Sequence, residues 1–360
     1  MLIGFDAQAT QGRQSGLGFY TRNLLRELEQ IIAEPLRLKP YHEALPAEKD
    51  FSTFDRLRWA NWTLPGLAKR DKVDLLHVPA FAPPIGKPCP MVVTVPDIAG
   101  MLFPNQIGRP SALYWGKWLP FTFKKADRLI AISEHTKQDL VSHLGIKAEK
   151  IRVIYLSGHE NFSNSISSEK IRETVSKIGI LGRYFLFVGT MEPRKNLGRI
   201  LDAFKLVRNE ISDLQLVLVG SKQFAHGKYA EQLAKAHDLD SNSVIAPGFL
   251  DQEDLNALYC GALGLLFPSL YEGFGIPILE AMASGCPVLT SNITSTPEVA
   301  GDAGILVDPY KTEEIARGIK DLAKDDALRA RLRQRGFDQI KKFSWQKAAR
   351  KTLEIYNEFL

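Results

Sequence analysis

Short apolar runs of β-prone residues alternate along the chain with longer stretches whose apolar residues recur at helical spacing. Between Leu197 and Val207, apolar side chains recur at intervals of three and four, which places them on one face of a helix. Strands that alternate with helices form parallel sheets covered by helices, so the pattern predicts an α/β fold. The runs that we expect to form strands are Leu2–Asp6, Val73–Val78, Met91–Val95, Arg128–Ile132, Ile151–Leu156, Phe185–Val188, Leu214–Val219, Val244–Ile245, Leu263–Phe267, Pro287–Leu289 and Ile305–Val307.

A polar segment interrupts this alternation near the middle of the chain. Residues 157–170, SGHENFSNSISSEK, are rich in Ser and Asn and show no apolar period, and a new strand begins after Arg183. Such a segment is typical of a linker between domains. We expect an N-terminal Rossmann-like domain over 1–160 and a C-terminal one over 161–344. A last helix over 345–360 could pack on either of them.

The composition is that of an ordinary globular protein, with 360 residues of which 45% are hydrophobic and 24% charged. Three scattered cysteines argue against a disulfide framework or a zinc site and fit a reducing compartment. The chain opens without the features of a signal peptide, and no stretch approaches the roughly 18–20 apolar residues that cross a bilayer. We therefore expect a cytoplasmic protein. The net charge of +5 fits phosphate-bearing or anionic-lipid partners, and attachment to the inner face of a membrane stays open.

The strongest chemical signal lies in residues 267–291, FPSLYEGFGIPILEAMASGCPVLTS. An apolar strand ends, a glycine-containing loop follows, and Pro277 starts a short helix that Gly285 ends. Ligands of open α/β sheets bind at such strand ends, where glycines let backbone N–H groups approach an oxyanion. Carboxylates such as Glu272 and Glu280 accept hydrogen bonds from sugar hydroxyls. On their spacing alone, a solvated loop charge and a partner of the helix dipole explain the two residues as well.

Taken whole, the pattern S-x-x-E-G-F-G-x-P-x-x-E-A-M-A-x-G-x-P-V resembles the signature of the retaining glycosyltransferases of family 4. The resemblance implies the GT-B fold: two facing Rossmann-like domains with parallel sheets and an active site in the cleft between them. It also implies an α-linked product and no metal or other cofactor. By resemblance, the first glutamate and the loop backbone hold the donor sugar and diphosphate, and the second glutamate takes the ribose hydroxyls. These donor-binding residues are Glu272, Gly273, Phe274, Gly275, Ile276 and Glu280.

The resemblance continues in residues 187–204, FVGTMEPRKNLGRILDAF, whose pattern is similar to that of the O-antigen mannosyltransferase branch. Lys195 matches the family lysine. The family arginine usually follows the glycine directly, where this chain has Thr190, so we expect Arg194 to supply the guanidinium. Negative charge grows on a leaving diphosphate, and the two cations would stabilise it in place of a metal. Taken alone, an Arg-Lys pair also fits a solvated helix end.

Two further segments extend the donor site by resemblance. Residues 247–262 resemble the segment whose backbone near Leu250 faces the nucleotide base. In the N-terminal half, the residue matching Gly16 belongs to a glycine loop that lets the backbone approach the donor phosphate and the acceptor. This loop reads GxGxxT, which is weak evidence for dinucleotide binding.

One departure from the family concerns the catalytic position in the N-terminal half. Many relatives have histidine where this chain has Pro96, and a proline side chain can neither donate nor accept a hydrogen bond. Asp97 remains, and it could orient the acceptor hydroxyl or act as its base. His77, at the end of a strand, is expected to be a packed residue rather than a catalyst.

These observations predict a metal-independent, retaining hexosyltransferase that uses a nucleotide sugar, with GDP-mannose favoured and UDP-hexose second. We expect a glycan or lipid-linked acceptor and no nucleic-acid partner. One alternative is a weak or inactive nucleotide-sugar-binding partner of a glycosyltransferase complex, and another is a nucleotide-dependent oxidoreductase. An aromatic stretch, 110–128, and a basic C-terminal helix with Arg329 and Arg333 could contact anionic lipids, although burial and solvation explain them as well.

Overall fold

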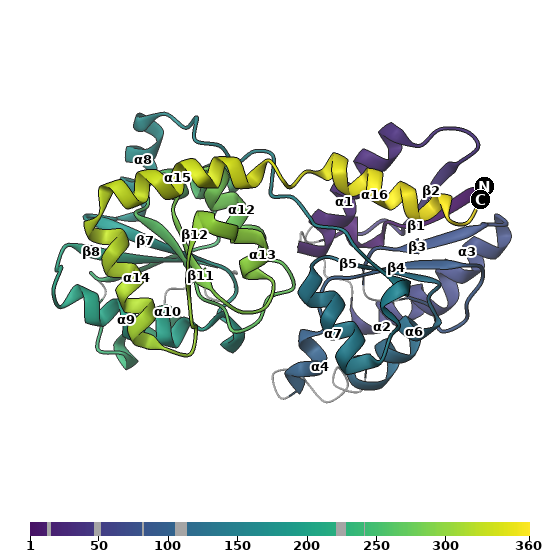
Figure 1. The fold of residues 1–360 in the computed structure, drawn as a ribbon, viewed down its shortest axis with the longest axis horizontal. Helices are drawn as coiled ribbons and strands as arrows, with labels where there is room; N and C mark the ends of the chain where they lie inside the picture. The colour runs from purple at the N-terminus through teal and green to yellow at the C-terminus, as the bar shows by residue number, and fades with distance from the viewer. Residues whose placement is uncertain (13–15, 47–51, 81–82, 105–113, 221–227, 241) are drawn as a thin grey trace. The chain divides into compact units, whose positions relative to one another are not determined.

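The computed structural model describes residues 1–12, 16–46, 52–80, 83–104, 114–220, 228–240 and 242–360. The chain divides into two compact units (Figure 1). Unit 1 comprises residues 1–156 and 344–360, and unit 2 comprises residues 157–343. In the described residues each unit is built on a six-stranded parallel sheet with helices packed against it, as the alternating apolar pattern predicts.

The sheet of unit 1 has the strand order β2-β1-β3-β4-β5-β6. The order reverses between β1 and β3, as it does in flavodoxin-like doubly wound sheets. Buried side chains of the central strands, such as Val93 and Leu129, form its core. The strands are β1 (Leu2–Asp6), β2 (Arg37–Tyr41), β3 (Leu75–Val78), β4 (Met91–Val95), β5 (Arg128–Ala131) and β6 (Ile151–Val153).

Strand β2 was not predicted from the sequence. It pairs only with β1, at the edge of the sheet, and most of its side chains are exposed or half-buried. An edge strand that is not buried on both faces needs no continuous apolar run. Pro40 also lies within it, and a proline in a run of residues normally argues against predicting a strand there. The pairing partner, which only the tertiary structure supplies, decides its conformation.

Helices surround this sheet, and their ends carry signals that the sequence contains. Helix α7, for example, begins after Ser133, whose hydroxyl accepts the backbone N–H of Thr136, and ends at Gly145 in the left-handed region. The helices of unit 1 are α1 (Gly16–Ile31), α2 (Thr53–Arg58), α3 (Leu64–Arg70), α4 (Ala99–Leu102), α6 (Leu119–Lys125), α7 (Glu134–Leu144) and α16 (Trp345–Asn357).

The C-terminal helix α16 belongs to unit 1, although it is the last element of the chain. It packs against α1, and the Trp345 indole meets the Phe19 ring edge-on with centroids 5.5 Å apart. Its Tyr356 hydroxyl lies 2.6 Å from Nδ1 of His77 on β3. Both side chains are fully buried, so the helix completes the core of the unit.

The sheet of unit 2 has the order β12-β11-β10-β7-β8-β9, which is the arrangement 3-2-1-4-5-6 of a Rossmann sheet seen from its other edge. The order reverses between the adjacent strands β7 and β10. The strands are β7 (Arg183–Val188), β8 (Leu214–Val219), β9 (Val244–Gly248), β10 (Gly264–Phe267), β11 (Val288–Ser291) and β12 (Gly304–Val307).

The helices of unit 2 pack in two groups. One contains α9 and α14, whose apolar faces form a core with the sheet around Phe204 and Ile319 (Figure 1). The other is a series of neighbours in which α8 contacts α11, α11 contacts α12, and α12 contacts α15. The helices are α8 (Ser168–Ile178), α9 (Leu197–Arg208), α10 (Lys228–Ala236), α11 (Gln252–Gly261), α12 (Ile276–Ala283), α13 (Thr296–Ala300), α14 (Thr312–Lys324) and α15 (Asp326–Ile340).

The segment that we expected to be a linker differs from that expectation. The units divide after Leu156 rather than after residue 160, and α8 begins at Ser168, within the last three residues of the polar stretch. Ser167 caps this helix, and Thr174 is buried against Asp254 of α11. The helix has a polar exposed face, which is why the segment lacks the apolar content of a core element.

Candidate functional site

A ligand site of a doubly wound sheet lies where the strand order reverses, outside the carboxyl ends of the strands. In unit 2 this place is the end of β7 and β10. The loop after β7 contains Thr190, Arg194 and Lys195, and the loop after β10 contains Glu272 and leads into α12. The topology of the sheet therefore brings together the two segments that carry the strongest sequence signals.

Lys195 ends a 3-10 turn, Pro193–Lys195, and its side chain is almost completely buried. Asn196 follows with φ +62°, a left-handed conformation that Asn tolerates better than most residues. The Lys195 ammonium donates to Glu272 Oε1 at 2.5 Å and lies 5.0 Å from the centre of the Phe267 ring. Because both charges are buried, each depends on the other for compensation.

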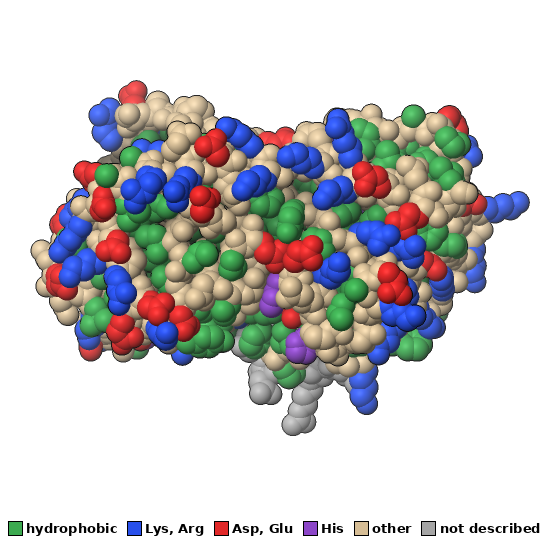
Figure 2. Space-filling model, in the orientation of Figure 1, with side chains coloured by type: hydrophobic (Ala, Val, Ile, Leu, Met, Phe, Trp, Pro, Cys, Tyr) green, Lys and Arg blue, Asp and Glu red, His purple; other side chains and the backbone are tan. Residues whose placement is uncertain are grey.

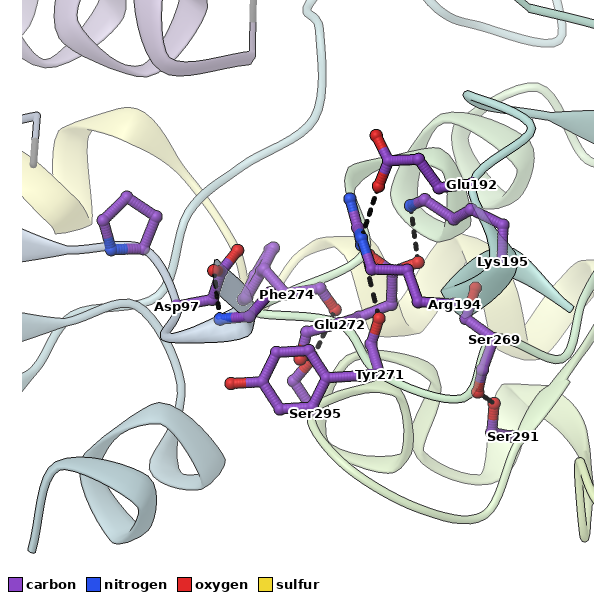
Figure 3. A network of polar contacts seen from close by, with 12 residues as sticks. Asp97, Glu192, Arg194, Lys195, Ser269, Tyr271, Glu272, Phe274, Ser291 and Ser295 are labelled. Carbon is purple, nitrogen blue, oxygen red and sulfur yellow. Dashed lines mark hydrogen bonds and ion pairs between the residues drawn. The ribbon is translucent and has the colours of Figure 1, made fainter. Parts of the chain in front are cut away.

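Arg194 approaches the same carboxylate from a second direction (Figure 3). Its guanidinium donates to Glu272 Oε2 and to the Tyr271 carbonyl, both at 3.3 Å, and to Glu192 Oε2 at 2.6 Å. Burial by itself would raise the pKa of Glu192, but the charge of Arg194 holds that pKa below its ordinary value. The site therefore holds two cations between two carboxylates.

The loop after β10 is fixed through its backbone carbonyls. Asn196 Nδ2 donates to the Pro268 carbonyl at 3.0 Å. The Ser295 hydroxyl, from the loop after β11, lies 2.9 Å from the Glu272 carbonyl and 3.0 Å from the Phe274 carbonyl. Gly275 has φ +109°, a conformation that an L side chain rarely adopts, and it leads directly into α12. The loop after β10 is thus held in place by side chains from the loops that follow the two neighbouring strands, β7 and β11.

Glu280 lies within α12 and is 5% exposed. Its Oε1 atom is 2.5 Å from His159 Nδ1, and the Tyr259 hydroxyl of α11 donates to Oε2 at 3.3 Å. The structure thus gives this carboxylate partners that differ from those of Glu272. One acidic side chain is paired with cations at the switch point, and the other lies in a cluster of aromatic and imidazole rings.

The other predicted donor residues of unit 2 lie along the same strand ends. Thr190 follows Gly189 at the end of β7, and Leu250 follows the end of β9, where it is half-buried. Its neighbour Phe249 is 64% exposed. Gly273 and Phe274 are buried within the loop after β10, and Ile276 begins α12. Their roles toward a ligand stay predictions.

In unit 1, the two predicted residues lie on different elements. Gly16 is the first residue of α1, and a Cβ atom there would meet nothing within 4 Å. Asp97 follows β4, and its Oδ1 accepts the backbone N–H of Ala99, the first residue of α4, at 2.9 Å. The Pro96 carbonyl accepts the Thr136 hydroxyl at 3.2 Å.

His77 has the packed environment that its position at a strand end predicts. Its ring lies between Tyr356 and Thr94, with Nε2 3.1 Å from the Thr94 hydroxyl. Complete burial lowers the pKa of His77 to about 3, so the imidazole is neutral near pH 7. A neutral, fully hydrogen-bonded ring inside the core serves stability rather than proton transfer.

Sequence reasoning missed four residues that shape the site. Asn196 and Ser295 hold the loop after β10, and His159 and Tyr259 hold Glu280. None of these residues has a linear signal, because each acts on a partner that is distant along the chain. Asn196 offers a partial clue, since it follows the Arg-Lys pair at a turn before a helix.

The basic helix near the C-terminus is α15, and several of its arginine side chains are bound to other residues of unit 2. The Arg333 guanidinium donates to the Gly285 carbonyl, Arg329 pairs with Asp326, and Arg335 lies 3.6 Å from Asp302. Figure 2 shows Lys and Arg side chains along α15 with acidic side chains among them. Of the aromatic stretch 110–128, residues 110–113 lie outside the described residues, Phe123 is buried, and Phe121 is half exposed.

Two kinds of feature are absent from the described residues. No group of three His, Cys, Asp or Glu side chains there is arranged to hold a metal ion. Across that same part of the chain, none of the helices combines the length and the apolarity needed to cross a bilayer.

Comparison with known sequences divides the chain into the same two parts. Residues 173–339 match the profile described as glycosyl transferases group 1, and residues 15–156 match that described as glycosyltransferase family 4. Among curated relatives is the O-antigen chain mannosyltransferase B of Escherichia coli, 30% identical over 266 residues. That match covers 74% of this chain and 69% of the relative.

A second relative is the serotype-specific mannosyltransferase WbdA of Escherichia coli, 32% identical over 240 residues. Here the match covers 66% of this chain but only 29% of the relative, so most of WbdA has no counterpart in it. Among solved structures, Anabaena Alr3699/HepE in complex with UDP and glucose has a TM-score of 0.71 at 19% identity, covering 99% of both chains. At this identity the likeness concerns the fold.

Two Rossmann-like α/β units in one chain, together with the likeness to HepE, define the GT-B fold. This confirms the two Rossmann-like domains with parallel sheets that the sequence resemblance implied. The chain belongs to the group 1 glycosyltransferases.

Proposed function

We propose that this chain transfers a mannosyl residue from GDP-mannose to a glycan or lipid-linked glycan, with retention of configuration and without a metal ion. The observation that carries the proposal is the contact of Lys195 and Arg194 with the single carboxylate of Glu272 at the switch point of unit 2. Two cations and an acidic side chain in one place are the groups that a nucleoside diphosphate and a sugar require.

The two cations supply what a divalent metal would otherwise supply to the leaving group. As the bond between the anomeric carbon and the diphosphate oxygen breaks, its electron pair stays on that oxygen. Arg194 and Lys195 are already held in place by Glu272, so they can stabilise this charge without first reorganising. The new bond forms from the acceptor hydroxyl oxygen to the same carbon.

For retention, we favour attack on the face from which the diphosphate leaves. The proton of the acceptor hydroxyl then passes to the departing phosphate oxygen. In this scheme Glu272 binds hydroxyls of the donor sugar, and Glu280 accepts the ribose hydroxyls. Asp97 orients the acceptor hydroxyl.

The mannosyl donor is favoured because the relatives described above are mannosyltransferases by name. UDP-hexose is the second choice, since the similar fold of HepE was solved with UDP and glucose. A lipid-linked acceptor fits the half-exposed Phe121 beside the cationic Lys125 of α6, which would let unit 1 touch an anionic membrane.

A nucleotide screen followed by a transfer assay tests this function. GDP and GDP-mannose should raise the unfolding temperature more than UDP and UDP-glucose do, because a ligand that binds only the folded state stabilises it. Incubation with GDP-mannose and mannose-terminated glycans should then release GDP, and a chelator should leave the rate unchanged. If none of these nucleotides stabilises the protein, the proposed donor site is wrong.

A binding protein without activity is the second candidate, and Pro96 favours it. The proline occupies the position where many family members have a histidine, and its carbonyl is engaged with Thr136. Such a protein would be stabilised by GDP-mannose yet neither transfer nor hydrolyse it. Release of GDP above that of a Lys195→Ala variant would exclude this candidate.

A further inference from the structure

The contact between His159 and Glu280 has a defined direction. His159 lies just after the start of unit 2, and its Nδ1 is 2.5 Å from Glu280 Oε1. An ionised carboxylate only accepts hydrogen bonds, so Nδ1 must carry the proton. The ring therefore donates to one oxygen of the carboxylate and fixes its orientation.

The second oxygen of Glu280 is held from a different helix. The Tyr259 hydroxyl donates to Oε2 at 3.3 Å, and burial together with the Glu280 charge raises the pKa of Tyr259 well above its ordinary value. The tyrosine therefore stays protonated. The Phe162 ring lies beside both partners, with centroids 5.6 Å from His159 and 5.7 Å from Tyr259, so the donors are themselves packed.

The backbone of the His159 segment is also close to α12. A Cβ atom at Gly158 would lie 3.2 Å from Leu279 Cβ and 3.7 Å from the Glu280 nitrogen. This close approach brings the imidazole to the carboxylate, and it leaves little freedom for the ring to swing away. Because each carboxylate oxygen can accept more than one hydrogen bond, both still have capacity for a ligand hydroxyl.

We propose that His159 is a positioning residue of the nucleotide site, which holds Glu280 in the orientation that accepts the two ribose hydroxyls of the donor. The inference rests on the proposed function, because it takes the nucleoside diphosphate as the ligand of this site. It adds a residue that the family pattern does not identify, and it assigns that residue to the ribose rather than to the base or the sugar.

The role has a consequence that simple packing does not share. If His159 acts through Glu280 on the ribose, its loss should weaken only ligands that carry the ribose hydroxyls. A merely structural His159 would weaken every nucleotide alike. The 2′,3′-dideoxy form of the nucleotide is therefore the informative probe.

The experiment measures by calorimetry the affinity of the full-length protein for GDP, UDP and their 2′,3′-dideoxy forms. GDP or UDP must first bind the wild type, and if neither does, the proposed function fails before the inference is tested. For the nucleotide that binds, His159→Ala should raise Kd about tenfold, as expected for a lost charge-assisted hydrogen bond network. The Kd of the dideoxy form, weaker at the outset, should stay unchanged.

Two matched variants complete the design. His159→Asn places an amide N–H near the position of Nδ1 and should recover most of the affinity. His237 provides a control with an equal contact distance, because its Nδ1 is 2.5 Å from Oδ1 of Asp202, a carboxylate that has no place in the proposed donor site. His237→Ala should leave all four affinities unchanged.

The outcomes separate the alternatives. Equal weakening of the normal and dideoxy nucleotides by His159→Ala would overturn the inference in favour of a structural role, and unchanged affinity for both would overturn it as well. An unfolding temperature close to that of the wild type shows that the alanine variant is folded. If it is not folded, His159→Phe, which keeps a ring beside Phe162 but cannot donate to Glu280, decides by the same criterion.

Discussion

The ammonium of Lys195 and the carboxylate of Glu272 lie 2.5 Å apart, although 77 positions separate them in the sequence. Both are buried, and they come from loops that follow the adjacent strands β7 and β10. A charge pair of this kind needs a reason besides stability, because two charges lose their hydration when they are buried. The proposed function provides one, since an incoming diphosphate would share the cation.

Removal of either cation should slow transfer in a protein that still folds, because Glu272 keeps the other cation as a partner. Lys195→Ala and Arg194→Ala are each expected to lower kcat by about a hundredfold or more, because each would remove stabilisation of charge on the leaving group. Initial rates of GDP release at saturating donor measure the effect. Lys205→Ala is a suitable control, since Lys205 pairs with the exposed Asp238 and should be neutral. Wild-type rates in both active-site variants would contradict the proposed phosphate contacts.

Because the Lys195–Glu272 pair is buried, substitutions in it should also change the free energy of unfolding. Glu272→Leu leaves the buried ammonium uncompensated and should lower the free energy of unfolding by about 3–5 kcal/mol. The double variant Lys195→Met/Glu272→Leu should regain most of that loss and still be inactive. Urea denaturation and the transfer assay measure the two properties separately. A double variant with activity would show that the pair is not part of the catalytic site.

Asp6 should make the stability of unit 1 depend on pH. Its carboxylate ends β1, and burial raises its pKa to about 6, although the Gln8 N–H and the Trp59 indole donate to it. A folded-state pKa above the unfolded value of 3.8 means that the stabilising contribution is present below that value and is lost as the pH rises through about 6.

Asp6→Asn should therefore gain stability relative to the wild type between pH 4 and pH 7. A shift of about two pKa units corresponds to a relative gain on the order of 3 kcal/mol. Urea denaturation of both proteins across this range measures it, and the difference between them removes the contribution of other titrating groups. A constant difference across the range would contradict the prediction.

The C-terminal helix should depend on the contact between His77 and Tyr356. Tyr356→Phe removes the hydroxyl that meets Nδ1 of the buried ring and should lower the free energy of unfolding by about 1–3 kcal/mol. Donor affinity should not change, because both residues lie in the core of unit 1. Tyr310→Phe, at an exposed tyrosine, is the control and should be neutral in both measurements. A selective loss of nucleotide binding in Tyr356→Phe would show that α16 has a different role.

Several features of this protein were determined by the sequence alone. Apolar runs predicted the strands of the interior, because a strand buried on both faces needs continuous apolar residues. Glycine and proline marked the loop and the helix after β10, since their backbone restrictions act locally. The edge strand β2 escaped detection because its covering comes from a neighbour rather than from its own composition.

Only the tertiary structure decided which of these residues meet. The strand order places the ends of β7 and β10 side by side, and that order brings Lys195 and Arg194 to Glu272. It likewise took the packing of the segment after Leu156 against α12 to bring His159 to Glu280. The preferences of neighbouring residues determine where a helix, a strand or a turn forms. Contacts between residues that are distant in the sequence depend instead on how the whole sheet is assembled.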